Sequence, residues 1–522
     1  MYVTIRDLFE QTVHKYPDKE ALCYPDKQIR WTYAEWNREV NRLANALTGA
    51  GVRKGDRVST FLFNTEELAT CLFACAKLGA VFNPINFRLK PEELAFIVGD
   101  AEPTVLLFEQ ALSTTVEAIH SRFPDLQFWC VDAEVPAFAV DYHARVDAGP
   151  DTRPDTVVEE TDLYGIMYTS GTTGHPKGVM HRHRDMVDQS MTILAELRLT
   201  AHDKGLSCAP LFHCAELHCN LIPRIHVGAG SVILHQFEPQ RVLELVGQER
   251  VTTMFCAPTM WNMLLQEDLS RYDLGSLKRG LYGAAPMAPA LVRACQEKLN
   301  VALFQAYGQT EMGPAVTFLR DYEQMDKNGS AGNATLNHEI RVIATAEDRR
   351  VEPEETLPPG EVGEIIVRGP GMMIGYFNRD DATAKAIYKG WYYSGDLGYL
   401  DADNYLYVAD RKDDMVISGG ENIYPREVED TLYEHPDVRD VAVLGRPDAH
   451  WGETVVAFVV VSNPDTGAEA LDAFCRASPR LADYKRPREY HFIDELPRNA
   501  SGKTQKFILR ERLARARADQ PD

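Results

Sequence analysis

Short runs of apolar, largely β-branched residues alternate with longer amphipathic segments through most of the first 340 residues. Each run has the length of a buried strand, and each following segment repeats its apolar residues at helical spacing. Strands separated by helices in this way favour α/β units with a parallel sheet. The clearest strand–helix pairs are residues 56–63 with 66–80, 229–235 with 239–250, and 251–258 with 259–269.

A different pattern begins at about residue 340. Residues 360–420 form short alternating stretches punctuated by Gly, Asp and Asn, which predicts an antiparallel or barrel-like subdomain. Residues 425–481 then follow the order helix, strand, strand, helix, as in a small α+β unit. The charged stretch Asp410–Asp414 is the expected joint. We therefore expect an N-terminal domain over residues 1–412, made of α/β sheet subdomains and the barrel-like part, and a small α+β C-terminal domain over residues 413–522.

Length and charge narrow the classes of protein. A chain of 522 residues exceeds what one hydrophobic core usually serves. The net charge of −22 argues against nucleic acid as the main partner, because a phosphate backbone requires a basic face. The sequence contains no apolar run of about 18 residues, so we expect no integral membrane segment. The ten scattered cysteines do not have the spacing of a disulfide framework, which favours a reducing cytoplasm.

The stretch YTSGTTGHPKG, residues 168–178, has the composition of an anion-binding loop. A glycine-rich run after a strand can turn backbone N–H groups towards phosphate, while hydroxyls and a lysine add further donors. The Walker pattern of P-loop NTPases fails here, because Pro176 replaces its last glycine and Gly178 replaces its Mg²⁺-binding hydroxyl. The candidate phosphate contacts are Thr169, Ser170, Gly171, Thr172, Thr173 and Lys177.

The ordered string T-S-G-T-T-G-x-P-K-G resembles the phosphate loop of the adenylate-forming (ANL) superfamily, which includes acyl-CoA synthetases and aryl-CoA ligases. Four further segments match the motifs of that superfamily in the right order and extend the resemblance over essentially the whole chain. These segments are YGQTE at 307–311, YYSGDLGYLD at 392–401, DRKDDMVISGGENIYPREVE at 410–429 and LPRNASGKTQK at 496–506.

The resemblance implies a role for each matched residue. Lys503 would be the catalytic lysine, Thr310 would contact the α-phosphate of ATP, and Glu311 would bind Mg²⁺. Asp413 would be the hinge of a mobile C-terminal domain, and the pantetheine arm of coenzyme A would pass along Ser418, Gly419 and Gly420. The implied nucleotide-binding residues are Thr169, Ser170, Gly171, Thr172, Thr173, Lys177, Gly283, Ala284, Ala285, Tyr307, Gly308, Gln309, Thr310, Asp396 and Arg411, of which the last two would hold the ribose.

The segment PLFHCAELHCN, residues 210–220, gathers histidines and cysteines in a pattern that invites a zinc interpretation. Structural zinc sites usually join two ligand pairs across a long loop, and no second pair of fitting spacing is present. The resemblance instead places His213 near the acyl carboxylate, as a catalytic residue. The implied acyl pocket comprises His213, Cys214, His218, Cys256, Ala257, Gly283 and Gly308.

The resemblance implies an ATP-dependent, AMP-forming ligase that converts a hydrophobic carboxylic acid to its acyl-CoA through an acyl-adenylate. The pocket candidates include no Asp to pair with an α-amino group, which disfavours an amino acid substrate. Similarity in the loop and hinge segments favours a medium- or long-chain fatty acid. An aryl or cyclic acid, or loading of a carrier protein, are the alternatives. The expected partners are ATP, Mg²⁺, coenzyme A and a small carboxylic acid, and the resemblance is compatible with a homodimer.

Overall fold

The structure is a computed structural model of the 522-residue chain. It describes residues 3–169, 176–285, 287–346, 349–411, 414–418, 421–448, 451–478, 481–498 and 504–518, without the side chains of residues 411, 422 and 516–518. The chain divides into two compact units, Met1–Glu339 with Val367–Tyr392 and Ile340–Ile366 with Tyr393–Asp522. No described helix is both long and apolar enough to cross a membrane.

The larger unit contains two large sheets, and its longest run of neighbouring strands is parallel. In the first sheet, the six neighbouring strands from β14 to β1 all run parallel, as the sequence predicts. Its order is β16 (Asn333–Ala334), β15 (Thr317–Leu319), β14 (Ala302–Tyr307), β13 (Arg279–Gly283), β12 (Thr253–Phe255), β10 (Lys204–Ser207), β11 (Gly230–Ile233), β1 (Glu20–Tyr24) and β2 (Ile29–Thr32).

The second sheet is parallel from β8 to β7 and ends in antiparallel strands at its other edge. Its order is β19 (Gly375–Tyr376), β9 (Lys177–Arg182), β8 (Leu163–Thr169), β4 (Val81–Pro84), β3 (Arg57–Phe61), β5 (Val105–Phe108), β6 (Gln127–Cys130) and β7 (Val140–Asp141). The antiparallel pair β8 and β9 flanks the predicted phosphate loop.

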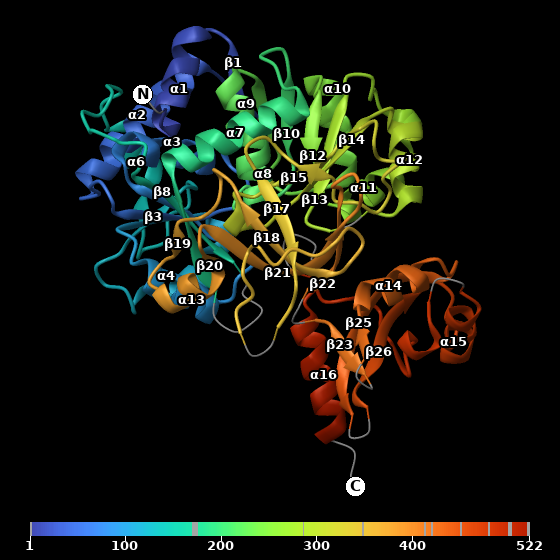
Figure 1. The fold of residues 1–522 in the computed structure, drawn as a ribbon. Coiled ribbons are helices and arrows are strands. Elements are labelled where there is room, and N and C mark those ends of the chain that lie inside the picture. The colour runs from blue at the N-terminus through green and yellow to red at the C-terminus, as the bar shows by residue number, and fades with distance from the viewer. Residues whose placement is uncertain are drawn as a thin grey trace. The chain divides into compact units, whose positions relative to one another are not determined.

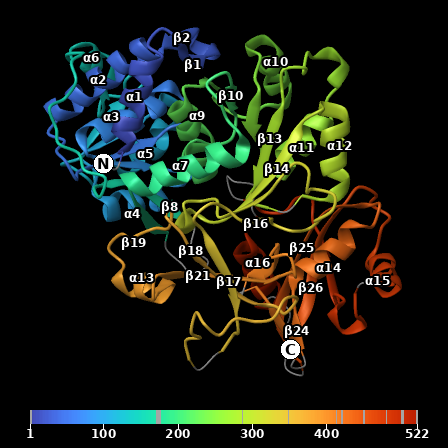
Figure 2. The same cartoon turned by 45° about the horizontal axis from the view of Figure 1, so that its top comes forward.

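Helices cover both sheets of the larger unit. Figures 1 and 2 show α10, α11 and α12 beside the strands from β12 to β14. Helix α3 is buried over its whole length, and Gly79 ends it in the left-handed conformation. The helices are α1 (Ile5–Lys15), α2 (Tyr33–Gly49), α3 (Glu66–Leu78), α4 (Pro91–Ala101), α5 (Ser113–His120), α6 (Tyr142–Asp147), α7 (His183–Leu197), α8 (Cys214–Glu216), α9 (Ile222–Val227), α10 (Pro239–Glu249), α11 (Pro258–Leu265), α12 (Pro289–Leu299) and α13 (Asp380–Ala386).

The smaller unit holds the C-terminal part of the chain. One sheet, whose strand β20 (Ile387–Tyr388) belongs to the larger unit, has the order β17 (Glu339–Ile343), β18 (Gly363–Arg368), β21 (Trp391–Leu400) and β20, with β22 (Leu406–Arg411) beside β21. The other has the order β24 (Glu421–Ile423), β23 (Val416–Ser418), β26 (Gly452–Val461) and β25 (Val438–Asp448), with β27 (Glu489–Phe492) beside β26. Helices α14 (Pro425–Tyr433), α15 (Ala468–Ala477) and α16 (Lys506–Ala518) belong to this unit. The predicted fold class is confirmed, whereas the boundary between residues 412 and 413 lies outside the described residues and stays a prediction.

Candidate active site

The predicted pocket residues follow the carboxyl ends of neighbouring parallel strands. His213 comes after β10, Cys256 after β12, Gly283 ends β13 and Gly308 comes after β14. These strands are adjacent in the order β14, β13, β12, β10. Since open α/β sheets bind ligands at this edge, the topology brings residues nearly a hundred positions apart to one end of the sheet.

Lys177 lies at the start of β9, where it is the register partner of Thr169 on β8. The phosphate loop therefore joins two antiparallel strands, whereas the loop of a P-loop NTPase leads into a helix. The Nζ atom of Lys177 lies 5.2 Å from the centre of the Tyr376 ring. Ser170, Gly171, Thr172 and Thr173 lie outside the described residues.

Glu311, the predicted Mg²⁺ ligand, is buried and held at two points. The Tyr376 hydroxyl donates to its Oε1 atom at 3.0 Å, and the backbone N–H of Met373 donates to its carbonyl oxygen at 2.8 Å. Tyr376 lies on β19, opposite Val179 of β9. One phenol ring thus links the predicted phosphate-binding lysine with the predicted metal-binding carboxylate. Sequence reasoning missed Tyr376.

Thr310 begins a 3₁₀ turn, Thr310–Met312, and contacts two side chains. Its carbonyl oxygen accepts a hydrogen bond from His181 Nε2 at 2.8 Å, and its hydroxyl lies 3.3 Å from the Cys214 thiol. The structure therefore brings together Thr310, which the sequence assigned to nucleotide binding, and Cys214, which it assigned to the acyl pocket. His181, a second residue that sequence reasoning missed, lies on β9.

Close backbone packing explains the two predicted pocket glycines. A Cβ atom on Gly308 would lie 1.6 Å from the carbonyl oxygen of Pro314, and one on Gly283 would lie 2.7 Å from that of Ala306. Ala284, next to Gly283, has a φ of +64°. This left-handed conformation costs an L-residue about 1 kcal/mol, and such strain gathers at ligand sites. Ala285 follows Ala284 in the chain. The backbone N–H of Val316 donates to the carbonyl oxygen of Tyr307, and two residues further on the Gln309 side chain accepts from the Tyr392 hydroxyl at 2.8 Å.

His213 caps the short helix α8, since its Nδ1 atom accepts from the backbone N–H of Ala215 at 3.2 Å. Loss of solvation lowers the pKa of His213 to about 4. The ring is therefore neutral near pH 7, with its proton on Nε2. Burial raises the pKa of Cys214 to about 12, so this side chain is a thiol and not a thiolate.

A π-helical turn, Leu217–Leu221, follows α8. Such turns are rare and frequently lie at functional sites. Beside it, Glu216 and Arg224 form a fully buried ion pair with a 2.7 Å contact, and burial raises the pKa of Glu216 to about 7. His218 is buried, and the neighbouring rings are those of Tyr164 and His181. In the described part of the chain, no group of three His, Cys, Asp or Glu residues is arranged to hold a metal ion.

Cys256 and Ala257 connect β12 to α11. The Sγ atom of Cys256 lies 3.6 Å from that of Cys208, and both cysteines are buried. Ala257 is the N-terminal cap residue of α11, whose first residue is Pro258. A nearby apolar cluster contains Cys219, Phe255 and Leu281, with Ala215, Met260 and Ala306 packed against it.

In the smaller unit, Asp396 on β21 and Arg411 on β22 are direct register partners. The register places the backbones of the two predicted ribose-binding residues opposite each other on neighbouring strands. Asp396 is buried, and its N–H donates to Ser394 Oγ at 3.0 Å. Ser418 ends β23, whereas Asp413, Gly419, Gly420 and Lys503 lie outside the described residues.

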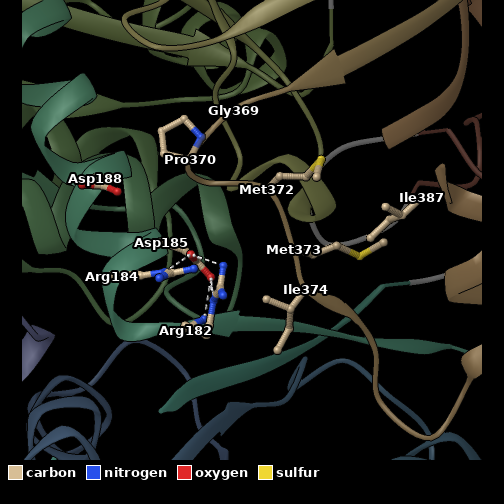
Figure 3. Close-up of a pocket in the computed structure, with 10 residues that line it drawn as sticks. All are labelled: Arg182, Arg184, Asp185, Asp188, Gly369, Pro370, Met372, Met373, Ile374 and Ile387. Carbon is tan, nitrogen blue, oxygen red and sulfur yellow. Dashed lines mark hydrogen bonds and ion pairs between the residues drawn. The ribbon is translucent and has the colours of Figure 1, made fainter. Parts of the chain in front are cut away.

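A pocket of about 560 Å³ is lined in part by Met373, the residue whose backbone N–H donates to Glu311. Figure 3 shows Arg182, Arg184 and Asp185 at the start of α7 on one side of it, and Met373 and Ile374 on the other. Asp185 pairs with Arg182 at 2.9 Å, so the charges largely cancel. No residue predicted for the active site lines it.

Comparison with known proteins identifies the family. Residues 9–377 match the family described as AMP-binding enzyme, and residues 427–503 match the AMP-binding enzyme C-terminal domain. The chain belongs to the AMP-binding enzyme family and is an AMP-forming acid–CoA ligase. Ligases of this class use ATP and coenzyme A as co-substrates and Mg²⁺ as the metal ion.

Three relatives cover almost the whole chain. A feruloyl-CoA synthase from Amycolatopsis sp is 41% identical over 92% of this chain and 94% of its own length. An indoleacetate–CoA ligase from Aromatoleum aromaticum is 35% identical over 96% of both chains. A long-chain-fatty-acid–CoA ligase from Mycobacterium tuberculosis is 34% identical over 95% of this chain and 96% of its own.

Among the solved structures that share the fold are two CoA ligases with bound ligands. An anthranilate CoA ligase in complex with anthranoyl-AMP has a TM-score of 0.89 at 30% identity, covering 99% of this chain and 98% of its own. An o-succinylbenzoate coenzyme A synthetase from Bacillus subtilis, in complex with ATP and magnesium ion, has a TM-score of 0.84 at 32% identity, covering 97% of this chain and 99% of its own.

Proposed function

We propose that this ligase activates an aromatic carboxylic acid, of the class to which ferulate belongs, and transfers it to coenzyme A. The observation that carries this proposal is the 41% identity to feruloyl-CoA synthase over 92% of the chain, against 34% for the long-chain-fatty-acid ligase. The fatty acid that the sequence motifs favoured becomes the second candidate. Loading of a carrier protein is third.

The apolar cluster near the candidate pocket supports an aromatic substrate. Phe255 offers a ring for stacking or edge contact, while Ala215 and Ala306 occupy little space beside it. A planar aromatic acid gains contact on such a wall without fixing many rotatable bonds. A long aliphatic chain would lose more conformational freedom there.

Activation begins when the carboxylate attacks the α-phosphorus of ATP, giving an acyl-adenylate and pyrophosphate. This step brings negative charges together, so catalysis depends on positioning and charge compensation. Lys177 and the hydroxyls of the 169–173 loop would hold the phosphates, Thr310 would contact the α-phosphate and Lys503 would bridge both reactants. Asp396 and Arg411 would fix the ribose. The placement of Lys177 near Tyr376 and Glu311 supports this assignment.

Glu311 fits the Mg²⁺ role, because a buried carboxylate fixed by a tyrosine hydroxyl offers the hard oxygen that this ion prefers. When bound, Mg²⁺ supplies positive charge to the phosphates. His213 would act by hydrogen bonding. Since its ring is neutral, Nε2–H can donate to the acid carboxylate and orient it.

The second half-reaction is attack of the coenzyme A thiol on the adenylate, which releases AMP. We propose that the domain over residues 413–522 turns about Asp413 between the two halves, removing Lys503 and bringing Ser418, Gly419 and Gly420 to the pantetheine arm. The superfamily motif that contains these residues supports the assignment.

An acid panel tests the proposed function. Pyrophosphate and AMP release would be measured with ATP and Mg²⁺ for cinnamic, benzoic, medium-chain and long-chain acids, each with and without coenzyme A. We expect cinnamic-type acids to give the highest kcat/KM and to require coenzyme A for turnover. Turnover of long-chain acids alone would favour the second candidate, and adenylate formation without a thioester would favour a carrier protein. Light scattering of the same sample tests the expected homodimer.

A further inference from the structure

Four buried aromatic rings form a row that begins at His181, the residue hydrogen bonded to Thr310. The ring centres of His181 and His218 lie 6.0 Å apart, those of His218 and Tyr164 lie 5.9 Å apart, and those of Tyr164 and His183 lie 5.8 Å apart. The residues come from β8, β9, the π-helical turn and the start of α7. All four are at most 2% exposed. We term them the ring cluster.

Five polar atoms of the ring cluster are buried without a hydrogen-bond partner among the residues that the structure describes. They are Tyr164 OH, His181 Nδ1, His183 Nε2, and both ring nitrogens of His218. Most buried polar atoms in native proteins are hydrogen bonded, and an unpaired one destabilises the fold. Five such atoms in one row therefore call for a common explanation.

The proton positions follow from the bonds at the two ends of the row. His181 Nε2 donates to the Thr310 carbonyl, so its Nδ1 is a bare acceptor. His183 Nδ1 accepts from the backbone N–H of Ile5 at 3.3 Å, so its Nε2 carries a proton. Burial lowers the pKa of all three histidines, which keeps them neutral. With His218 and Tyr164 each contributing one donor and one acceptor, the row presents three donors and three acceptors.

Water satisfies such a balanced set, because one buried molecule both donates and accepts and usually makes about three hydrogen bonds. A cation would require converging acceptors, and half of these groups are donors. We propose that ordered water molecules bind within the ring cluster, and that this hydrated cluster fixes His181 as a positioning residue for Thr310. The proposal rests on the proposed function, which gives Thr310 its contact with the α-phosphate.

His181 can affect the reaction because it positions Thr310, the proposed α-phosphate contact. Its Nε2 holds the Thr310 carbonyl at 2.8 Å together with the backbone N–H of Gly313 at 3.2 Å, and Cys214 contacts the hydroxyl of the same residue. Water at Nδ1 would hold the imidazole in the orientation and tautomer that make the Nε2 bond. Because a shift of 1 Å at a reacting centre can cost about a hundredfold in rate, losing this support should slow adenylation.

Two measurements test the proposal. The first is a crystal structure of the full chain at high resolution, in which we expect water within hydrogen-bond distance of His218 and of the Tyr164 hydroxyl. A dry ring cluster would overturn the proposal. This measurement is independent of activity, so it remains decisive even if no acid is turned over, an outcome that would count against the proposed function alone.

The second measurement compares pyrophosphate release by His181→Leu, His181→Gln and His218→Leu, with the exposed His202→Leu as a matched control. We expect His181→Leu to lower kcat about tenfold with little change in KM for the acid. His181→Gln should recover most of the loss, because its amide can donate to the Thr310 carbonyl. The kcat of His218→Leu should lie between those of His181→Leu and the wild type, and the kcat of His202→Leu should match the wild type. Equal kcat for His181→Leu, His181→Gln and the wild type, each corrected for the folded fraction, would refute the positioning role.

Discussion

Removing one oxygen atom, in the substitution Tyr376→Phe, tests whether Glu311 is the metal-binding carboxylate. The Tyr376 hydroxyl donates to Glu311 Oε1 at 3.0 Å, and the same ring lies 5.2 Å from the Lys177 ammonium. Phenylalanine keeps the ring beside Lys177 and loses only the donor. The substitution therefore separates the support of Glu311 from the cation–π contact.

The expected loss of activity follows from the strength of the hydrogen bond that Tyr376→Phe removes. A hydrogen bond to a charged group contributes about 1.5–3 kcal/mol, and about 1.4 kcal/mol corresponds to a factor of ten. Without its donor the buried carboxylate can turn away from the metal position. We expect kcat/KM for ATP to fall between about tenfold and a hundredfold at limiting Mg²⁺, with partial recovery as Mg²⁺ is raised.

The assay is the initial rate of pyrophosphate release as Mg²⁺ is titrated at fixed ATP and acid. Tyr33→Phe is the matched control, since the Tyr33 hydroxyl donates to the carbonyl of Ala229 at 2.6 Å and its loss removes a buried hydrogen bond of α2. Both variants should be slightly less stable, and only Tyr376→Phe should change the Mg²⁺ dependence. A Tyr376→Phe enzyme within twofold of the wild type at every Mg²⁺ concentration would refute the reasoning.

Three further predictions concern packing and charge. Gly308→Ala should abolish activity and lower the thermal midpoint, because its Cβ would lie 1.6 Å from the Pro314 carbonyl oxygen; a variant with normal turnover would show that this turn can shift freely. His183 has its pKa lowered by burial to about 4 from 6.5, so the unfolded chain binds the extra proton and stability should fall as the pH drops from about 6.5 to 4. Urea unfolding should show a loss of up to about 3 kcal/mol from this residue, and a flat profile would argue against a neutral buried ring. Arg224→Met should destabilise the fold by about 3–5 kcal/mol by leaving Glu216 buried without its partner, and adding Glu216→Gln should restore part of that; no recovery in the double variant would mean that the lost packing, and not the charge, is responsible.

The sequence predicts local features of this fold well. The apolar runs at residues 229–235 and 251–258 contain β11 and β12. The amphipathic segments after them match α10 and α11, although α11 begins one residue earlier than predicted, at Pro258. These elements are decided by periodicity within a dozen residues, which is what sequence patterns record. The parallel order of the sheets followed from the same alternation.

The residues that sequence reasoning missed depend on contacts between distant segments. Tyr376 reaches Glu311 only because β19 pairs with β9, and His181 reaches Thr310 across 129 positions. No local pattern encodes such pairing, and a histidine or tyrosine in a short strand looks like any other strand residue. The π-helical turn at Leu217–Leu221 was missed for a similar reason, since its extra residue depends on the packing around it and not on composition.

The most direct test of the proposed substrate is a competition. The enzyme would be given ATP, Mg²⁺ and coenzyme A with equal concentrations of a hydroxycinnamic acid and a long-chain fatty acid, and the acyl-CoA products would be quantified by mass spectrometry at early times. We predict that the aromatic thioester dominates, by at least the tenfold that about 1.4 kcal/mol of selectivity provides. A product mixture dominated by the fatty acyl-CoA would contradict the proposal and restore the fatty acid as substrate.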